Sequence, residues 1–387
     1  MFQFKNKTVF LISSDRWGVM KVSKHHYALE LAKAGAKVFF IEPPLLSNKG
    51  IEITVCPDDE NISIVKYKPV FRGRRFLPAI VYSYLLRLQI NLLVKKLAVQ
   101  PDVVWCFHAF LFQNLQWFKA ATTIYFAADL FETEHLPQEI YSADLLFAVS
   151  DTIKETLQKS GKPVVQIHHG LQNSFVQIAE ELLQKNTYAA TTATSITAGY
   201  TGNLRMQALD RKMMMQIITA HTEIKFLFWG AYKQGDLNLG GELTEEADAF
   251  ISFLQTAPNV ELRGVVNGNQ LQEQMSACNL FWVCWKTEVH KLWDGSNSHK
   301  LLEYLSTGSP VVAHYVSTYK NTDLLYMLPV KNNAAYPNLF KSVVQTIVAG
   351  EPIEKIQRRL AFATSNSYTK QLHRIETAIN AFQQHQL

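Results

Sequence analysis

Short apolar runs alternate with helix-like segments along most of the chain. Each run is a few residues long, which is typical of buried strands. The first set of expected strands comprises Thr8–Ile12, Val38–Ile41, Val103–Phe107, Thr123–Phe126, Leu145–Val149 and Val164–Ile167. This alternation predicts a parallel sheet with helices on both faces. Because ligands of such sheets bind beyond the carboxyl ends of the strands, functional side chains are expected at Ser13–Trp17, His108 and Asp129.

A second set of strands follows a break in the pattern. Residues 184–194 are rich in Thr and Ala and include Asn186, without a clear period, which predicts an exposed loop near a domain junction. The later strands are expected at Ile196–Tyr200, Lys225–Trp229, Val260–Leu262, Leu280–Cys284 and Pro310–Ala313. The segment Ile353–Gln384 has a helical pattern. A length of 387 residues also favours two domains.

One segment near the end of the second set carries the signals of a capped helix followed by a strand. Three residues that cap helices well precede it, namely Ser296, Asn297 and Ser298. Apolar residues then repeat at helical spacing until Gly308, which can adopt the left-handed conformation that ends a helix. The start of such a helix suits a phosphate, and Lys300 lies in its first turn. Glu303, one turn on, could accept both hydroxyls of a ribose. The alternative is an ordinary capped helix.

These elements, taken in order, resemble the retaining GT-B glycosyltransferases of family 4, also called group 1. The resemblance is closest to the enzymes of teichuronic acid and capsular polysaccharide assembly. Its basis is a Lys…Glu-Tyr-Leu run before Gly-x-Pro-Val-Val, together with matching segments along nearly the whole chain. The matching segments are Lys24–Gly35, Val38–Pro43, Ala143–Ser150, His168–Leu171, Tyr200–Leu204, Phe226–Gly230, Asn259–Gly264 and Lys300–Val312.

The resemblance implies two Rossmann-like domains with a cleft between them and a C-terminal helix that crosses back. We place the acceptor domain at residues 1–175, the nucleotide-sugar domain at 176–360 and the returning helix at 361–387. The donor would be a UDP- or GDP-linked sugar, and the acceptor a polysaccharide or a lipid-linked precursor. The expected donor-binding residues are Gly202, Asn203, Arg205, Asp294, Asn297, Ser298, Lys300 and Glu303.

The resemblance assigns roles to several of these residues. Gly202 allows close approach of the backbone, and Arg205 and Lys300 would neutralise the leaving diphosphate. No Asp-x-Asp motif is present, so transfer without a metal ion is expected. The family often has an acid eight positions before the glutamate that corresponds to Glu303. Gly295 stands at that position, and Asp294 is one residue away.

In the first domain, Asp129 and His169 are the expected catalytic residues. Asp129 follows a strand and could deprotonate or orient an acceptor hydroxyl; its alternative role is a helix N-cap. His169 precedes Gly170 at the expected crossover between domains. His26, in the first helix, is more simply explained as a packed histidine.

Two other functions stay open. A nucleotide-sugar epimerase would share the fold type but need no acceptor. A non-catalytic relative would bind sugar nucleotide without turnover, which the loss of the acid at position 295 allows.

Charge and composition narrow the choice of partners. The net charge of +5 is too mild for a nucleic-acid-binding protein. The four cysteines show neither metal-ligand nor disulfide spacing, which fits a reducing cytoplasm. Neither a signal peptide nor a membrane-spanning run is recognised.

The stretch from Asn61 to Pro101 contains no Asp or Glu and interleaves basic with apolar residues. Residues 66–96 therefore predict contact with an anionic membrane surface, and the expected location is the cytoplasm, peripheral on the inner face of the plasma membrane. The alternative for this stretch is a core helix with a solvated basic end.

Overall fold

A computed structural model describes residues 1–18, 21–71, 76–129, 135–185, 195–233, 241–266, 268–286 and 298–385. The chain divides into two compact units. Unit 1 comprises Met1–Gly170 and Tyr368–Leu387, and unit 2 comprises Leu171–Ser367. The divisions differ by five to seven residues from those expected, after 175 and after 360. Unit 2 keeps its own ends together, because the Leu171 amide donates to the Asn366 carbonyl at 2.8 Å.

The sheet of unit 1 has eight strands in the order β3-β4-β2-β1-β5-β6-β7-β8. All neighbours are parallel except β3, which runs antiparallel to β4 at the edge. The strands are β1 (Thr8–Ile12), β2 (Lys37–Ile41), β3 (Ile51–Val55), β4 (Ile62–Tyr67), β5 (Val103–Cys106), β6 (Thr122–Ala127), β7 (Leu145–Ala148) and β8 (Val164–Gln166). The central strands are buried along their whole length, as expected for a sheet covered on both faces.

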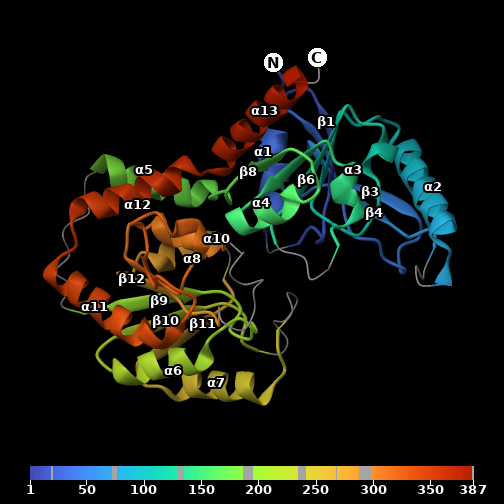
Figure 1. Cartoon of the computed structure of the whole chain (residues 1–387). Helices are drawn as coiled ribbons and strands as arrows, with labels where there is room; N and C mark the ends of the chain where they lie inside the picture. The colour runs from blue at the N-terminus through green and yellow to red at the C-terminus, as the bar shows by residue number, and fades with distance from the viewer. Residues whose placement is uncertain are drawn as a thin grey trace. The chain divides into compact units, whose positions relative to one another are not determined.

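Helices pack on this sheet in two groups. The last helix runs beside the first, so the end of the chain covers the same face as α1 (Figure 1). In the second group, α2 and α3 both pack on the short helix η2. The helices of unit 1 are α1 (Ser23–Lys33), α2 (Ala79–Leu97), η2 (Leu115–Phe118), α3 (Gln138–Ser142), α4 (Asp151–Gln158) and α13 (Tyr368–His385).

The sheet of unit 2 has six parallel strands in the order β11-β10-β9-β12-β13-β14. Numbered within the unit, this is 3-2-1-4-5-6, the strand order of the doubly wound dinucleotide-binding fold. The strands are β9 (Thr197–Thr201), β10 (Lys225–Trp229), β11 (Val260–Gly264), β12 (Leu280–Val283), β13 (Val311–Ala313) and β14 (Tyr326–Met327). The expected class, two Rossmann-like α/β domains, is therefore confirmed.

The helices of unit 2 form two layers around its sheet (Figure 1). One layer contains α5 and α12, which pack on each other, with α8 and α10; the other contains α6, α7 and α11. The helices are α5 (Asn173–Lys185), α6 (Arg211–Ala220), α7 (Glu245–Thr256), α8 (Gly268–Met275), α10 (His299–Leu305), η4 (Ser317–Tyr319), η5 (Asn333–Ala335), α11 (Tyr336–Ala349) and α12 (Ile353–Ser365).

The sequence pattern located most strands but missed three. The prediction treated the region from Asn61 as one basic apolar segment, yet its first residues form β4, with β3 paired beside it. Strand β3 is exposed, so it lacks the apolar run that identified the others. Strand β14 has only two residues. The helix expected after Ser298 is present as α10, and Gly308 follows it with a φ of +77°.

Two positions at the ends of neighbouring strands require glycine, because a side chain there would be strained or would clash. Gly230 has a φ of +136°, and a Cβ there would lie 1.9 Å from the carbonyl oxygen of Gly202. Gly264 has a φ of +70° but meets nothing closer than Tyr232, at 3.9 Å. The first position is limited by both backbone conformation and space, and the second by conformation alone.

We expect Gly230→Ala to lower the free energy of unfolding by about 3 kcal/mol or more, because strain and a backbone clash add. The matched control Gly264→Ala should cost about 1 kcal/mol, since only the strain remains. Urea denaturation of both variants measures the difference. Equal losses would show that the contact between Gly230 and Gly202 does not constrain the fold.

Candidate functional site

The strand order fixes where each unit can bind a ligand. In unit 1 the order reverses between β1 and β5, and in unit 2 between β9 and β12. A crevice opens at the carboxyl ends of the strands at such a reversal, because the adjoining loops turn to opposite faces. The loops concerned begin at Ser13 and Phe107 in unit 1, and at Gly202 and Cys284 in unit 2.

A buried lysine lies at the switch point of unit 2. The Lys300 side chain crosses from α10 to the end of β9, where its Nζ lies 4.8 Å from the ring centre of Tyr200 and 5.7 Å from that of Trp285. Its one side-chain hydrogen bond to a described residue, to the Tyr200 hydroxyl, is long at 3.4 Å. We call Tyr200, Gly202, Trp285, Lys300 and Glu303 the lysine site.

Gly202 is what lets Lys300 lie there. A Cβ on Gly202 would come within 2.5 Å of the Lys300 Nζ, and the φ of +134° also favours glycine. The ammonium therefore lies directly against the loop that follows β9. The prediction that Gly202 permits close approach at this loop fits this packing, although here the approaching group belongs to the protein.

The electrostatics of the lysine site are unusual. Lys300 and Glu303 are each only 8% exposed, and Lys300 makes no ion pair with any residue the structure describes. Burial lowers the pKa of Lys300 to about 8, against a smaller opposing effect of Glu303. Burial raises the pKa of Glu303 to about 7, which Lys300 partly offsets. The Lys300 ammonium is thus shielded from water, and no described residue forms an ion pair with it.

Helix α10 is anchored firmly at this position. The Tyr304 hydroxyl accepts a hydrogen bond from the Thr201 amide at 2.8 Å, and its ring stacks on Phe281 at 4.6 Å. Behind Trp285, His314 stacks on the indole at 5.2 Å and accepts from the Trp285 amide at 3.3 Å. Burial lowers the pKa of His314 to about 4, so this ring is neutral at pH 7. These contacts hold the aromatic walls of the lysine site.

Arg205 has a different environment from the one expected. Its guanidinium donates to the Tyr232 carbonyl at 2.8 Å, to the Glu242 carbonyl at 3.2 Å and to the Asp248 carboxylate at 2.6 Å. Three of the five N–H groups of an arginine are thus used within unit 2. Asn203 supports this arrangement, because its Oδ1 accepts from the Arg205 amide at 2.9 Å. The pairing of Arg205 with a diphosphate stays a prediction, and its observed contacts are structural.

Other predicted donor residues are placed only in part. Ser298 is the N-cap residue of α10, but its side chain makes no capping hydrogen bond. Asp294 and Asn297 lie outside the described residues. Of the loop expected at 184–194, the first two residues instead end helix α5, and residues 186–194 lie outside the described residues. Within the residues described, no group of three or more His, Cys, Asp or Glu side chains could hold a metal ion.

In unit 1, charged side chains gather where β1 meets α1. Lys24, in the first turn of α1, binds both the Ser14 hydroxyl and the Asp15 carboxylate. Ser23 beside it contacts the Nδ1 of His169 at 3.3 Å. His169 is buried, and its carbonyl accepts from Gln371 of α13 at 3.1 Å. The expected catalytic residue His169 therefore lies next to the start of α1.

Asp129 belongs to the same neighbourhood. Its carboxylate is exposed, yet partial desolvation by the surrounding protein raises its pKa, against the attraction of Lys24 and with the repulsion of Asp15. His108 interacts with the same two charges, and burial lowers its pKa. We call Asp15, Lys24, His108, Asp129 and His169 the α1 cluster. His26 instead stacks on Tyr368 at 4.9 Å, as a packed histidine would.

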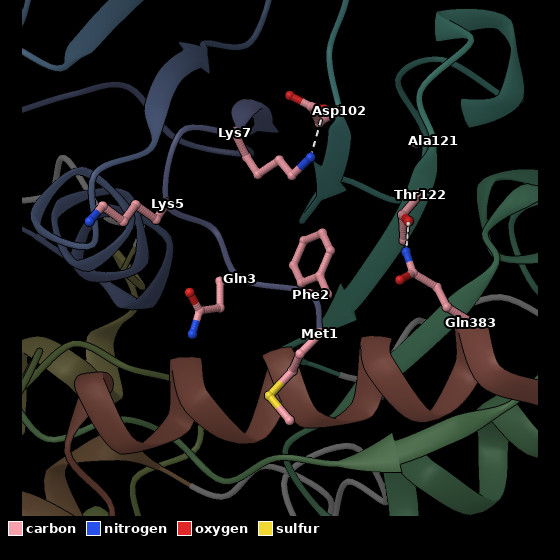
Figure 2. A pocket seen from close by; sticks show the side chains of 9 residues that line it. All are labelled: Met1, Phe2, Gln3, Lys5, Lys7, Asp102, Ala121, Thr122 and Gln383. Carbon is pink, nitrogen blue, oxygen red and sulfur yellow. Dashed lines mark hydrogen bonds and ion pairs between the residues drawn. The ribbon is translucent and has the colours of Figure 1, made fainter.

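A polar hollow at the opposite edge of the same sheet is a poorer candidate. It has a volume of about 450 Å³ and lies at the amino ends of β1, β5 and β6. In Figure 2, Lys7 reaches Asp102 at 3.3 Å and Gln383 reaches Thr122 at 3.4 Å. Four of its polar side chains are thus engaged in two pairs, and the hollow is remote from the carboxyl ends of the strands.

Comparison with known proteins identifies the fold. No family model matches the chain, and no curated protein matches it. Among solved structures, one similar protein is the E. coli trehalose-6-phosphate protein bound with UDP-2-fluoro glucose. The two share 11% sequence identity with a TM-score of 0.67, over 97% of this chain and 99% of the other.

Two further structures give the same result. Sucrose-phosphate synthase from Thermosynechococcus elongatus has 12% identity and a TM-score of 0.67, over 97% and 99% of the two chains. HepE from Anabaena, in complex with UDP, has 12% identity and a TM-score of 0.62, over 97% and 100%. The chain therefore has the GT-B glycosyltransferase fold, as the sequence resemblance implied. Membership of family 4 stays a prediction.

The desolvated charges of the lysine site should weaken the fold. Since Glu303 titrates near 7 rather than at its ordinary 4.5, stability falls as pH rises across that interval. Since Lys300 titrates near 8 rather than 10.5, stability recovers from there upward. We expect the double variant Lys300→Met, Glu303→Gln to lack this trough and to be about 1–3 kcal/mol more stable at pH 7.5. Denaturation of parent and variant at acidic, neutral and alkaline pH tests it; a less stable variant would contradict the argument.

Proposed function

We propose that the protein is a glycosyltransferase that moves a sugar from a nucleotide-diphosphate sugar to a glycan or lipid-linked acceptor. The observation that carries the proposal is Lys300, a buried cation without a described ion-pair partner at the switch point of unit 2. A buried charge is costly unless it is paired. An anionic ligand such as a diphosphate would pair it, so the lysine site is built for a ligand of that charge.

The donor can be assigned to particular groups of the lysine site. Lys300 would bind the diphosphate and stabilise the charge that develops on it as the sugar leaves. Glu303, three residues later on the same helical face, would accept the ribose hydroxyls once it is ionised. Trp285, buried at the end of β12, would flank the donor. We propose that this cation takes over the charge neutralisation that a metal ion would otherwise provide, and that anomeric configuration is retained, as in the family that the sequence resembles.

The α1 cluster supplies the groups for the acceptor. A carboxylate whose pKa is raised by desolvation is a stronger base, so Asp129 is suited to receive the proton of an acceptor hydroxyl. Lys24 and Asp15 set the local field around it. His169, held by Ser23 and by its own backbone, would help to orient the acceptor.

The acceptor is proposed to lie at a membrane surface, as part of surface polysaccharide synthesis. None of the described helices is both long and apolar enough to cross a bilayer. Contact would instead be peripheral, through the basic apolar residues between 66 and 96. Several of these are exposed in the structure, including Arg87, Lys95 and Lys96.

A nucleotide panel tests the donor site. We expect UDP or GDP, but not both equally, to raise the melting temperature of the parent, because a ligand of the native state stabilises it by mass action. Glu303→Ala should lose most of that shift, and Lys300→Met should lose it for the diphosphate while a nucleoside alone is unaffected. Lys225→Ala, an exposed lysine of unit 2 paired with Glu261, is the matched control. No shift with any nucleotide in the parent would sink the donor assignment.

A second experiment tests the base. Once the donor is known, Asp129→Asn should lower kcat by about 10²–10⁴-fold while the nucleotide-induced melting shift stays unchanged. Asp144→Asn, a carboxylate of the same unit that is bonded to Thr123, serves as the control for removing an acid from unit 1. Full transfer activity in Asp129→Asn would exclude it as the base.

A further inference from the structure

Helix α2 carries an apolar ridge on its outer side. Ile80, Tyr84, Leu88 and Leu92 recur every fourth position along α2, and Phe76 continues this spacing just before the helix begins at Ala79. Phe76 and Ile80 are each 85% exposed, and Tyr84 is 68% exposed. The ridge comprises Phe76, Ile80, Tyr84, Leu88 and Leu92. Contiguous exposed apolar residues of this kind mark a contact surface.

Behind the helix is an apolar cavity of about 280 Å³. It lies between the inner side of α2 and the chain around the end of β4, and Figure 1 shows α2 beside β3 and β4. Leu46, Val70 and Phe71 line its rim and are each about two fifths exposed, so the cavity opens to solvent there. The other lining residues are Pro44, Tyr67, Pro69, Tyr82, Leu85, Leu86, Gln89, Leu111 and Phe112.

The cavity is large enough to hold a small apolar ligand. An apolar cavity of roughly 150 Å³ is enough to hold a benzene molecule. Its one amide side chain is already engaged, because the Gln89 Oε1 accepts from the Val70 amide at 2.7 Å. The Tyr67 hydroxyl is buried without a hydrogen-bond partner among the described residues. The rest of the lining is mostly apolar, so the interior suits hydrocarbon, and a flexible alkyl chain can follow such a space.

The exposed charges that α2 and the end of β4 place beside the cavity are all positive, whereas the one acid bonded to its lining, Glu139, is buried and accepts from the Phe112 amide at 3.0 Å. No Asp or Glu occurs between Asn61 and Pro101. Lys68 stands between two lining residues, and Arg87 follows a third; both are exposed. Lys95 and Lys96 lie at the far end of α2. A second copy of this face would bring like charges together, whereas an anionic lipid would complement them.

We infer that the cavity behind α2 holds the hydrocarbon chain of an anionic membrane lipid, while the ridge and the flanking cations contact the surrounding bilayer. This inference rests on the proposed membrane contact and gives it a defined binding site. The ridge and the flanking cations alone would bind any anionic membrane surface, but the cavity adds recognition of a single chain.

Dodecyl phosphate at monomeric concentrations is a suitable probe, and titration calorimetry measures its binding. We expect it to bind the parent in the presence of saturating UDP. Leu86→Trp, which fills the cavity, and Val70→Trp, which covers its rim, should weaken binding at least about tenfold, because losing contact with two methylene groups is enough for that. The doubly substituted ridge control, Ile80→Ser and Tyr84→Ser, should bind the monomeric probe like the parent but sediment less with phosphatidylglycerol vesicles.

Other outcomes would overturn the inference. Equal affinity of the parent and both cavity variants would show that the chain is not in the cavity. Loss of probe binding in Lys300→Met, with the cavity variants unaffected, would place the probe's phosphate at the lysine site instead. Binding of dodecyl maltoside as tight as that of dodecyl phosphate would remove the anionic requirement. In the cavity and ridge variants the melting temperature reports folding, and the UDP-induced melting shift reports the donor site. Failure of the lipid site therefore leaves the proposed function intact.

Discussion

The close packing of Gly230, Gly202 and Lys300 is the constraint on which the candidate donor site depends. Each contact in this series needs the absence of a Cβ, at 230 against the Gly202 carbonyl and at 202 against the Lys300 ammonium. The loop after β9 is therefore fixed by the strand beside it, and the ammonium is fixed by the loop. A charge held in this way needs little reorganisation when an anion arrives, which is the condition for strong electrostatic stabilisation.

Much of this arrangement was predictable from the sequence, because it depends on local signals. Apolar runs identified the buried strands, and the spacing of Lys300, Glu303 and Gly308 located the helix and its end. The parallel sheets followed from the rule that such alternation of strands and helices builds them, whereas the order of the strands came from the structure. Strand β3 was missed because it is exposed and lacks an apolar run, and β4 because Ser63 and Lys66 interrupt the apolar residues of a largely buried strand.

The parts that could not be predicted depend on contacts between residues distant in sequence. Arg205 looked like a free cation beside a glycine loop, but Asp248 and the carbonyls of Tyr232 and Glu242 surround its guanidinium. His314 gave no sequence signal as a support for Trp285. In unit 1, the link between Ser23 and His169 spans 146 positions, so no local pattern could reveal it.

Lys300 and the basic residues of α2 differ in their exposure to water, and this difference underlies the separate roles that we propose for them. Lys300 is buried beside aromatic rings, where a charge interacts strongly at short range with one ligand group. Arg87, Lys95 and Lys96 are exposed on α2, where solvent screens each charge and only their sum matters. A single buried cation suits recognition of a particular diphosphate, whereas several exposed ones suit a surface with many negative charges. The function we propose calls for both kinds of contact, a selective one for a small charged donor and a diffuse one for a membrane-bound acceptor.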